Sequence, residues 1–262
     1  MIRALYTAAS GMSAQQANLD TVANNLANSS TTGFRRRNLQ FEDMMYQNMV
    51  MPGAAQTTST TQAALQIGLG THAVSTAVVN TQGDFNQTNN QLDLAISGAG
   101  FFQVTRPDGT TAYTRDGSFK LTSAGQMVTA NGEALSPSIT IPTNATSITI
   151  SQYGIVTATI PGQTAASTLG QIQLATFPNP GGLNSIGGNL LTASGASGTA
   201  VVDNPGGSAG LGTLQQGSLE ASNVDVVEEF VQMVLAQRAY ESNSKVIKTA
   251  DDMYSQVNNM VR

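Results

Sequence analysis

The chain has 262 residues, of which 40% are hydrophobic and only 10% charged, and its formal net charge is −5. Globular proteins usually carry charges on about a quarter of their residues, so the surface of this protein offers little electrostatic repulsion against other copies. The excess of acidic residues and the lack of a large basic tract disfavour nucleic-acid binding. The absence of cysteine excludes disulfides and thiolate metal sites, and no stretch approaches the roughly 18 apolar residues of a membrane span.

The first predicted element is a helix over residues 3–27. Its apolar residues follow three- and four-residue steps, and several recur every seven residues, which keeps one apolar seam in register. These are Leu5, Met12, Leu19 and Leu26, with Val22 beside them. Gly11 costs the helix about 1 kcal/mol relative to alanine, and the turn-forming residues 28–33 end it. We therefore expect a helix that is weak on its own.

An extended arm with little core of its own is predicted for residues 34–70. It opens with the run Arg35-Arg36-Arg37 and contains Pro52-Gly53. The arginine run could bind an anionic partner. We favour the alternative that it pairs with Glu42, with Asp43 or with a neighbouring subunit. The arm residues selected as contact candidates are Phe34, Arg35, Arg36, Phe41 and Tyr46.

An all-β domain is predicted for residues 71–212. Apolar residues alternate over residues 92–96, as in a half-buried strand. Asp108-Gly109 and Asn131-Gly132 are tight turns typical of hairpins. Short-strand spacing continues to about residue 177, whereas the Gly-, Ser- and Asn-rich residues 181–212 predict long loops.

A second helix is predicted over residues 224–261, beginning at a capping box formed by Ser222 and Asp225. Two series of seven-residue spacing run along it. The first contains Val226, Met233, Tyr240, Ile247, Tyr254 and Val261, and the second contains Glu229, Ala236, Asn243, Ala250 and Val257. The alanines permit close approach of another helix, and an asparagine at such a position fixes register at some cost in stability.

The seams at the two ends can close on each other, as in any helical bundle, or on the seams of neighbouring copies. We favour the second interpretation because the helices differ in length and carry few charged flanking pairs. Each seam buries little in a lone subunit, so we expect the ends to become ordered on assembly. The predicted assembly interface contains Leu5, Met12, Leu19, Val22, Leu26, Val226, Met233, Ala236, Tyr240, Asn243, Ile247, Ala250, Tyr254, Val257 and Val261.

Catalytic motifs are not supported by their context. Residues 206–210 match the G-x-S-x-G pattern of serine hydrolases, but no predicted strand precedes them and no helix follows. His72 is the only histidine, which argues against both a triad and a metal site. Acidic pairs such as Glu42-Asp43 and Asp251-Asp252 are better explained as solvated surface than as glycosidase carboxylates. The sequence therefore predicts no catalytic, cofactor-binding or metal site, and it predicts that the protein is not an enzyme.

Motifs along nearly the whole chain resemble those of one family, the flagellar rod and hook axial proteins. The matching segments lie in family order at residues 8–12, 23–28, 32–36, 91–98, 100–104, 113–119, 216–224 and 237–241; they include Ala23-Asn24-Asn25-Leu26-Ala27-Asn28 and Tyr113-Thr114-Arg115-Asp116-Gly117-Ser118-Phe119. The resemblance implies an α+β fold. Its N- and C-terminal helices would form a coiled-coil-like pair, joined through the extended arm to an all-β middle domain.

The expected division is a terminal helical domain of residues 1–30 with 224–262, a connecting arm of residues 31–70 with 213–223, and an outer β domain of residues 71–212. The resemblance implies a structural subunit that polymerises into a rigid helical tube across the periplasm, transmits torque and carries the export channel. The length of the chain and its residues 41–54 and 65–68 resemble most the branch of the family that forms the distal rod. A larger proximal rod protein and a hook-type subunit remain alternatives.

The implied partners are other copies of the chain, proximal rod proteins, hook or hook-junction proteins, the periplasmic and outer-membrane ring proteins, and the flagellar export apparatus, with no nucleic acid and no direct membrane insertion. The resemblance also implies a location in the basal-body rod and type III export without a cleaved signal peptide. Met1–Ala9 lacks the apolar core of a signal peptide, in agreement with that expectation.

A competing hypothesis from another class is a secreted β-rich carbohydrate-binding or hydrolytic protein that its helices merely trimerise. Such a protein needs a groove with clustered aromatic side chains, but Tyr153 and Phe177 are the only aromatic residues between Leu121 and Leu219.

Overall fold

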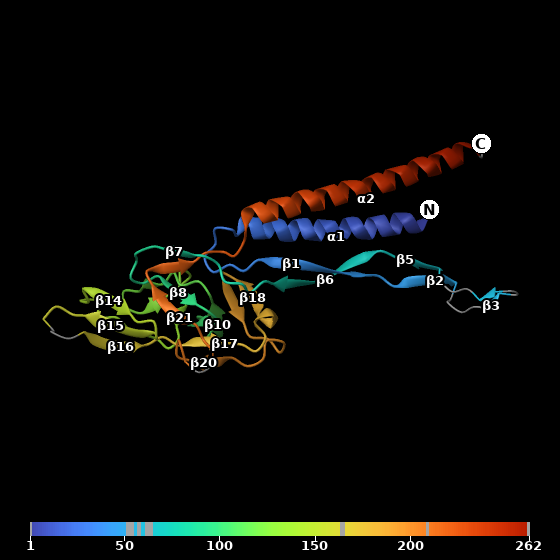
Figure 1. Cartoon of the computed structure of the whole chain (residues 1–262). Helices are drawn as coiled ribbons and strands as arrows, with labels where there is room; N and C mark the ends of the chain where they lie inside the picture. Colours follow the sequence, from blue (N-terminus) through green and yellow to red (C-terminus); the bar gives the residue numbers. More distant parts are fainter. Residues whose placement is uncertain are drawn as a thin grey trace. The chain divides into compact units, whose positions relative to one another are not determined.

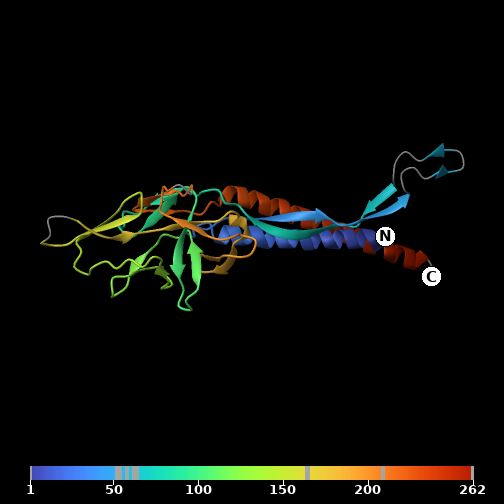
Figure 2. The same cartoon turned by 90° about the horizontal axis from the view of Figure 1, so that it is seen from below.

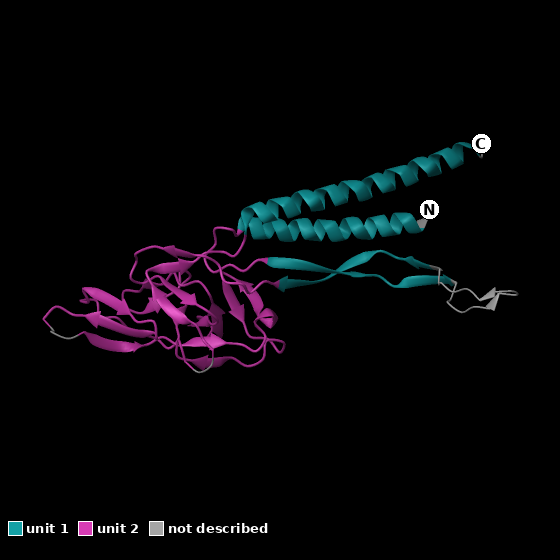
Figure 3. Ribbon diagram, in the orientation of Figure 1, with its two compact units in different colours: residues 1–27, 37–77, 225–262 teal, residues 28–36, 78–224 magenta. Residues whose placement is uncertain are grey.

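The chain folds into two units, each assembled from segments that are far apart in the sequence (Figure 3). Unit 1 comprises residues 1–27, 37–77 and 225–262, and unit 2 comprises residues 28–36 and 78–224. The computed structural model describes residues 2–50, 55–56, 59–60, 65–162, 166–207 and 210–260; Pro52-Gly53 and Val261 lie outside these ranges. Two helices and a strand-rich middle confirm the predicted α+β class. The finer three-part division stays a prediction.

The two predicted helices are present close to their expected bounds. Helix α1 spans Ile2–Ala27 and helix α2 spans Val226–Met260 (Figure 1). The start of α2 differs in detail from the predicted capping box. The Asp225 carboxylate oxygen Oδ1 accepts the backbone N–H groups of Val227 at 2.8 Å and Glu228 at 3.3 Å, so Asp225 is itself the cap. Its negative charge also suits the positive end of the helix dipole.

This capping predicts that Asp225→Ala destabilises α2 by about 1 kcal/mol, because two N–H groups of the first turn lose their acceptor. Ser222→Ala is the matched control. Ser222 Oγ accepts only the N–H of Val224 at 3.3 Å, before the helix begins, so its removal is expected to leave helix content unchanged. Urea unfolding followed by circular dichroism measures both variants. Equal effects of the two would show that the capping role of Asp225 is wrong.

The residues predicted as an extended arm form a β-ribbon in unit 1. Strand β1 (Arg37–Asp43) pairs with β6 (Thr71–Val78), and β2 (Tyr46–Val50) pairs antiparallel with β5 (Leu65–Gly68). Two further short strands, β3 (Ala55–Gln56) and β4 (Ser59–Thr60), form the next pair outward. Helix α1 contacts both α2 and β1, and Figures 1 and 2 show the ribbon running beside α1.

Unit 2 is built from short strands, and its largest sheet is centred on β9, which pairs with β10, β13 and β17. Smaller sheets join β14, β15 and β16, β8 with β21, and β7 with β22. The strands are β7 (Phe85–Gln87), β8 (Leu94–Ser97), β9 (Phe101–Thr105), β10 (Thr111–Thr114), β11 (Lys120–Leu121), β12 (Met127–Val128), β13 (Ala134–Leu135), β14 (Ser147–Ile150), β15 (Ile155–Thr159), β16 (Ser167–Gln171), β17 (Leu174–Thr176), β18 (Asn184–Gly187), β19 (Leu190–Thr192), β20 (Val201–Asp203), β21 (Thr213–Gln216) and β22 (Ser218–Glu220), with a short 3₁₀ helix at Pro180–Gly182.

The largest of the three hydrophobic clusters in the described part of unit 2 lies among these sheets. Phe102 and Phe119 are fully buried and meet edge to face, with ring centroids 5.1 Å apart. Leu94, Ile96 and Leu174 pack in the same cluster. Burial of these apolar side chains stabilises unit 2.

The prediction of long loops over residues 181–212 was wrong in part. Strands β18 and β19 form an antiparallel pair there, and β20 pairs with β17. Backbone pairing with strands already in the sheet determines these segments, and a composition rich in Gly, Ser and Asn does not prevent it.

Candidate assembly surfaces

The contact between α1 and α2 is made by small and polar side chains. The Asn25 side-chain amide donates to the Glu229 carboxylate at 3.2 Å, and both residues are buried. Two heptads away on each helix, a Cβ on Gly11 would lie only 2.9 Å from the Asn243 amide nitrogen. Among the helix residues whose burial the structure describes, the others that are buried are Ala8, Ala14, Val22, Ala236 and Ala250. Because little apolar area is covered, this contact contributes only modest stability.

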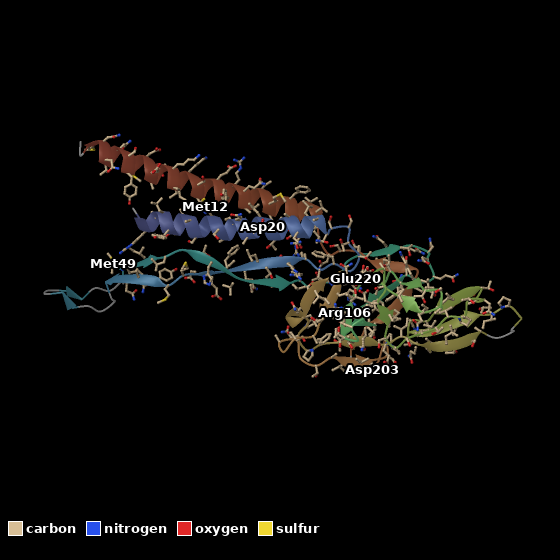
Figure 4. All side chains as sticks on the ribbon, turned by 180° about the vertical axis from the view of Figure 1, so that it is seen from behind. Met12, Asp20, Met49, Arg106, Asp203 and Glu220 are labelled. Atoms are coloured by element: carbon tan, nitrogen blue, oxygen red, sulfur yellow. The ribbon has the colours of Figure 1, made fainter. Side chains whose placement is uncertain are left out.

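The predicted interface residues are covered to different degrees in the single chain. Val22, Ala236 and Ala250 are buried. Leu5, Met12, Leu19, Leu26, Met233, Asn243, Ile247 and Tyr254 are half-buried, and Val226, Tyr240 and Val257 are exposed (Figure 4 labels Met12). The seven-residue series therefore keeps apolar surface uncovered in the lone subunit. Its role in contacts between copies stays a prediction.

A second apolar face of α2 was not predicted. We call it the outer stripe; it consists of Val227, Phe230, Val231, Val234 and Leu235, which are 51–72% exposed. At 3.6 residues per turn these side chains lie opposite the buried Glu229 and Ala236. A helix start that is apolar on nearly every side was the signal in the sequence, because such a helix is normally covered all round.

A third apolar surface lies on the β2–β5 ribbon. The exposed apolar residues here are Met44, Met45, Tyr46, Met49, Ile67 and Leu69, all at least 36% exposed and Met45 83% exposed. Tyr46 pairs with Gly68 and the Met44 N–H donates to the Gly70 carbonyl, so Met44 and Tyr46 point to one face of the ribbon, whereas Met45, Ile67 and Leu69 share the other. We call Met45, Ile67 and Leu69, together with Met49 of the bulge that follows, the hairpin patch. Methionine is flexible and polarisable, which suits it to contact surfaces. The Tyr46 hydroxyl bonds the Asp43 carboxylate, and this hydrogen bond with the nearby negative charge raises the pKa of Tyr46. Figure 4 labels Met49 on this ribbon.

The arm candidates are divided between the two units. Phe41 and Tyr46 are exposed residues of unit 1, whereas Phe34, Arg35 and Arg36 are half-buried in unit 2. The expected pairing of the arginine run with Glu42 or Asp43 was wrong for Arg35. Its guanidinium contacts the Glu220 carboxylate at 2.7 Å and also donates to the Thr81 carbonyl. Glu220 is far away in the sequence, so charge spacing alone did not reveal it.

Glu220, labelled in Figure 4, is a buried carboxylate that pairs with two arginines, Arg35 and Arg115. Its Oε2 lies 3.3 Å from Arg115 Nε, and Oε1 also accepts the Gly83 N–H at 3.1 Å. Arg115 further donates to the carbonyls of Gly100 at 2.8 Å and Gly98 at 2.6 Å. Burial lowers the pKa of Arg115 to about 10, against the opposing attraction of Glu220. This cluster ties β22 to β10 and to residues 33–36.

The chemistry of catalysis has no support in the described residues. His72 is an exposed residue of β6, and Ser208 lies outside the described ranges. In the part of the chain that the structure describes, no three His, Cys, Asp or Glu residues gather as metal ligands would. Within the same residues, neither helix has a stretch long and apolar enough to cross a membrane. The surfaces that stand out are apolar and suit protein–protein contact.

Comparison with known proteins agrees with a structural class. Residues 5–35 match the family model of the flagella basal body rod protein, residues 95–158 match the flagellar hook protein FlgE/F/G D1 domain, and residues 215–260 match the flagellar basal body rod FlgEFG protein C-terminal model. All three describe parts of flagellar axial proteins and none describes an enzyme.

Relatives match over the full length. The flagellar basal-body rod protein FlgG of Borreliella burgdorferi is 47% identical, with 100% of both chains covered. FlgG of Buchnera aphidicola from Acyrthosiphon pisum is 46% identical, covering 99% of this chain and 100% of the relative, and FlgG of Caulobacter vibrioides is 47% identical, covering 96% and 97%. The chain belongs to this family of flagellar basal-body rod proteins. The predicted family and the prediction that the chain is not an enzyme are thereby confirmed.

Proposed function

We propose that the chain is a structural subunit of the distal part of the flagellar basal-body rod, which polymerises into a rigid helical tube that transmits torque and carries the export channel. The observation that carries this proposal is the apolar surface left uncovered on α2 and on the hairpin patch. Contiguous exposed apolar surface in a soluble subunit marks a place of contact with other proteins. The names of the relatives favour a rod subunit over a hook-type one.

The terminal helices would form a coiled-coil-like pair in the tube. In support, Asn25–Glu229 and Gly11–Asn243 are contacts spaced by two heptads on both helices, which is the repeat that keeps a seam in register. Asn243 would then fix the register of the pair. Leu5, Met12, Tyr240 and Val257 would complete the seam with neighbouring copies, which cover what the lone pair leaves open.

The three-part division belongs to the same proposal. Residues 1–30 with 224–262 would line the channel, residues 31–70 with 213–223 would stiffen the tube as the arm, and residues 71–212 would face the surrounding rings. Contacts follow with proximal rod proteins, hook or hook-junction proteins, the periplasmic and outer-membrane rings and the export apparatus, after export without a cleaved signal peptide. No cofactor takes part.

Deletion and complementation test the proposal in the bacterium from which the chain derives. Without the chain, we expect cells that do not swim and basal bodies whose rod is shortened, because the tube lacks its distal segment. Electron microscopy of purified basal bodies measures rod length, and expression of the intact chain from a plasmid is the control that restores it. Complete rods in the deletion strain would overturn the proposal, as would recovery of the tagged chain only in the hook.

A further inference from the structure

The outer stripe and the hairpin patch are two different apolar surfaces on one unit. Glu229, Ala236 and Ala250 of α2 face inward and are buried, so the stripe on the opposite side of the helix points away from α1. The hairpin patch lies on the ribbon, which reaches α1 through β1, and Figure 1 shows α1 between α2 and the ribbon. The stripe of one chain therefore does not cover the patch of the same chain.

We propose that the outer stripe of one copy docks onto the hairpin patch of a second copy, an inference that rests on the proposed function. When the stripe of one copy contacts the patch of another, the pair of copies still has one uncovered stripe and one uncovered patch. Such a heterologous contact repeats without closing and generates an open helical polymer. A contact of stripe with stripe would close after two copies and would not extend.

The two surfaces match in chemistry. The stripe presents β-branched, leucine and phenylalanine side chains on a helix, and a methionine-rich surface adapts readily to such a face. None of the residues that define the two surfaces is charged.

Their charged borders match as well. Glu228 lies beside the first turn of the stripe, and Arg238 follows its last residue, where it also pairs with the exposed Glu241 at 3.3 Å. At the hairpin patch, Arg3 lies beside Met49, with Nη1 4.0 Å from the Met49 sulfur, and Glu42 and Asp43 precede Met44.

In one orientation of the helix on the ribbon, the charged residues at both ends of the outer stripe lie next to opposite charges at the hairpin patch. With Glu228 towards Arg3 and Arg238 towards the acidic pair, opposite charges meet at each end. Residues 228–238 of the helix span roughly 15 Å, which is the separation that the two charged ends of the patch have to match. Such complementarity selects one partner and one orientation.

Cysteine cross-linking tests the contact, since the chain has no cysteine of its own. Cells express two full-length variants together, Val231→Cys and Met45→Cys, and basal bodies are purified and oxidised mildly. We expect a disulfide-linked dimer at least about tenfold more abundant than with either variant alone. The matched control pairs Val231→Cys with Ile186→Cys, a residue of β18 that is 41% exposed and outside both surfaces.

Two results would overturn the inference. If stripes met each other, Val231→Cys alone would cross-link to itself. A dimer yield from Val231→Cys alone as high as the mixed yield therefore contradicts docking onto the hairpin patch. A mixed yield no higher than the Ile186→Cys control contradicts it too. The proposed function is judged separately in the same cells, because swimming and recovery of both variants in the rod establish rod membership even when no cross-link forms.

Charge exchange supplies a second measurement on the same pair. Arg238→Glu is expected to lower the mixed cross-link severalfold, because it then faces the acidic pair. Adding Glu42→Arg and Asp43→Arg to the partner copy is expected to restore the yield. Failure of the restoring change to raise the yield above that of Arg238→Glu alone would show that the borders do not meet.

Discussion

Glu220→Gln is expected to destabilise unit 2 by about 3–5 kcal/mol. The carboxylate lies between Arg35 and Arg115, and all three side chains are at most 11% exposed. Removing the negative partner leaves two positive charges buried without compensation, which costs far more than losing an exposed ion pair. Burial already lowers the pKa of both arginines against the attraction of Glu220, so the substitution lowers both pKa values further.

Urea unfolding of the full chain, followed by circular dichroism, measures this loss. Glu241→Gln is the matched control: Glu241 pairs with Arg238 at 3.3 Å, but the two side chains are 57% and 77% exposed. Exposed pairs of this kind contribute about 0.2–1 kcal/mol, so this control is expected to shift the urea midpoint only slightly. A Glu220→Gln variant as stable as Glu241→Gln would mean that the buried cluster does not hold unit 2 together.

The helices were predictable because their signals are local. Apolar spacing along residues 3–27 and 224–261 predicted bounds within two residues of α1 and α2. The turn at residues 28–33 and the acidic residue at 225 mark the ends by side-chain chemistry that acts over a few residues. The choice between Ser222 and Asp225 as cap was not decided by the pattern, because both residue types cap helices well.

Features that depend on distant parts of the chain were not predictable. Strand β19 pairs with β10, and β20 pairs with β17. The local sequence of residues 184–203 does not predict these partners. Likewise Arg35 and Glu220 meet only once the sheets are in place. The outer stripe is a different case. Its residues are local, but the seven-residue series selects only one side of the helix, and the stripe lies on the other side.

The largest functional effect is expected from charging the outer stripe. In the single chain Phe230 and Val234 are 51% and 53% exposed, so Phe230→Asp combined with Val234→Asp removes no core contact, and helix content of the purified subunit is expected to stay unchanged. In the polymer the same carboxylates would be buried against an apolar partner surface. Burying unpaired charges costs several kcal/mol each, which exceeds the strength of a single contact between copies.

Cells carrying this double variant are therefore expected to lose swimming and to build no distal rod, although the chain is made and folded. The matched control places two aspartates at Ile186 and Val202, exposed residues of unit 2 that are each 41% exposed; it adds the same charge away from the stripe and is expected to keep the cells swimming. Rod length in electron micrographs and swimming on soft agar measure both strains. Normal rods in the Phe230→Asp, Val234→Asp strain would mean that water still reaches the stripe after assembly, and that other surfaces of the terminal helices hold the copies together.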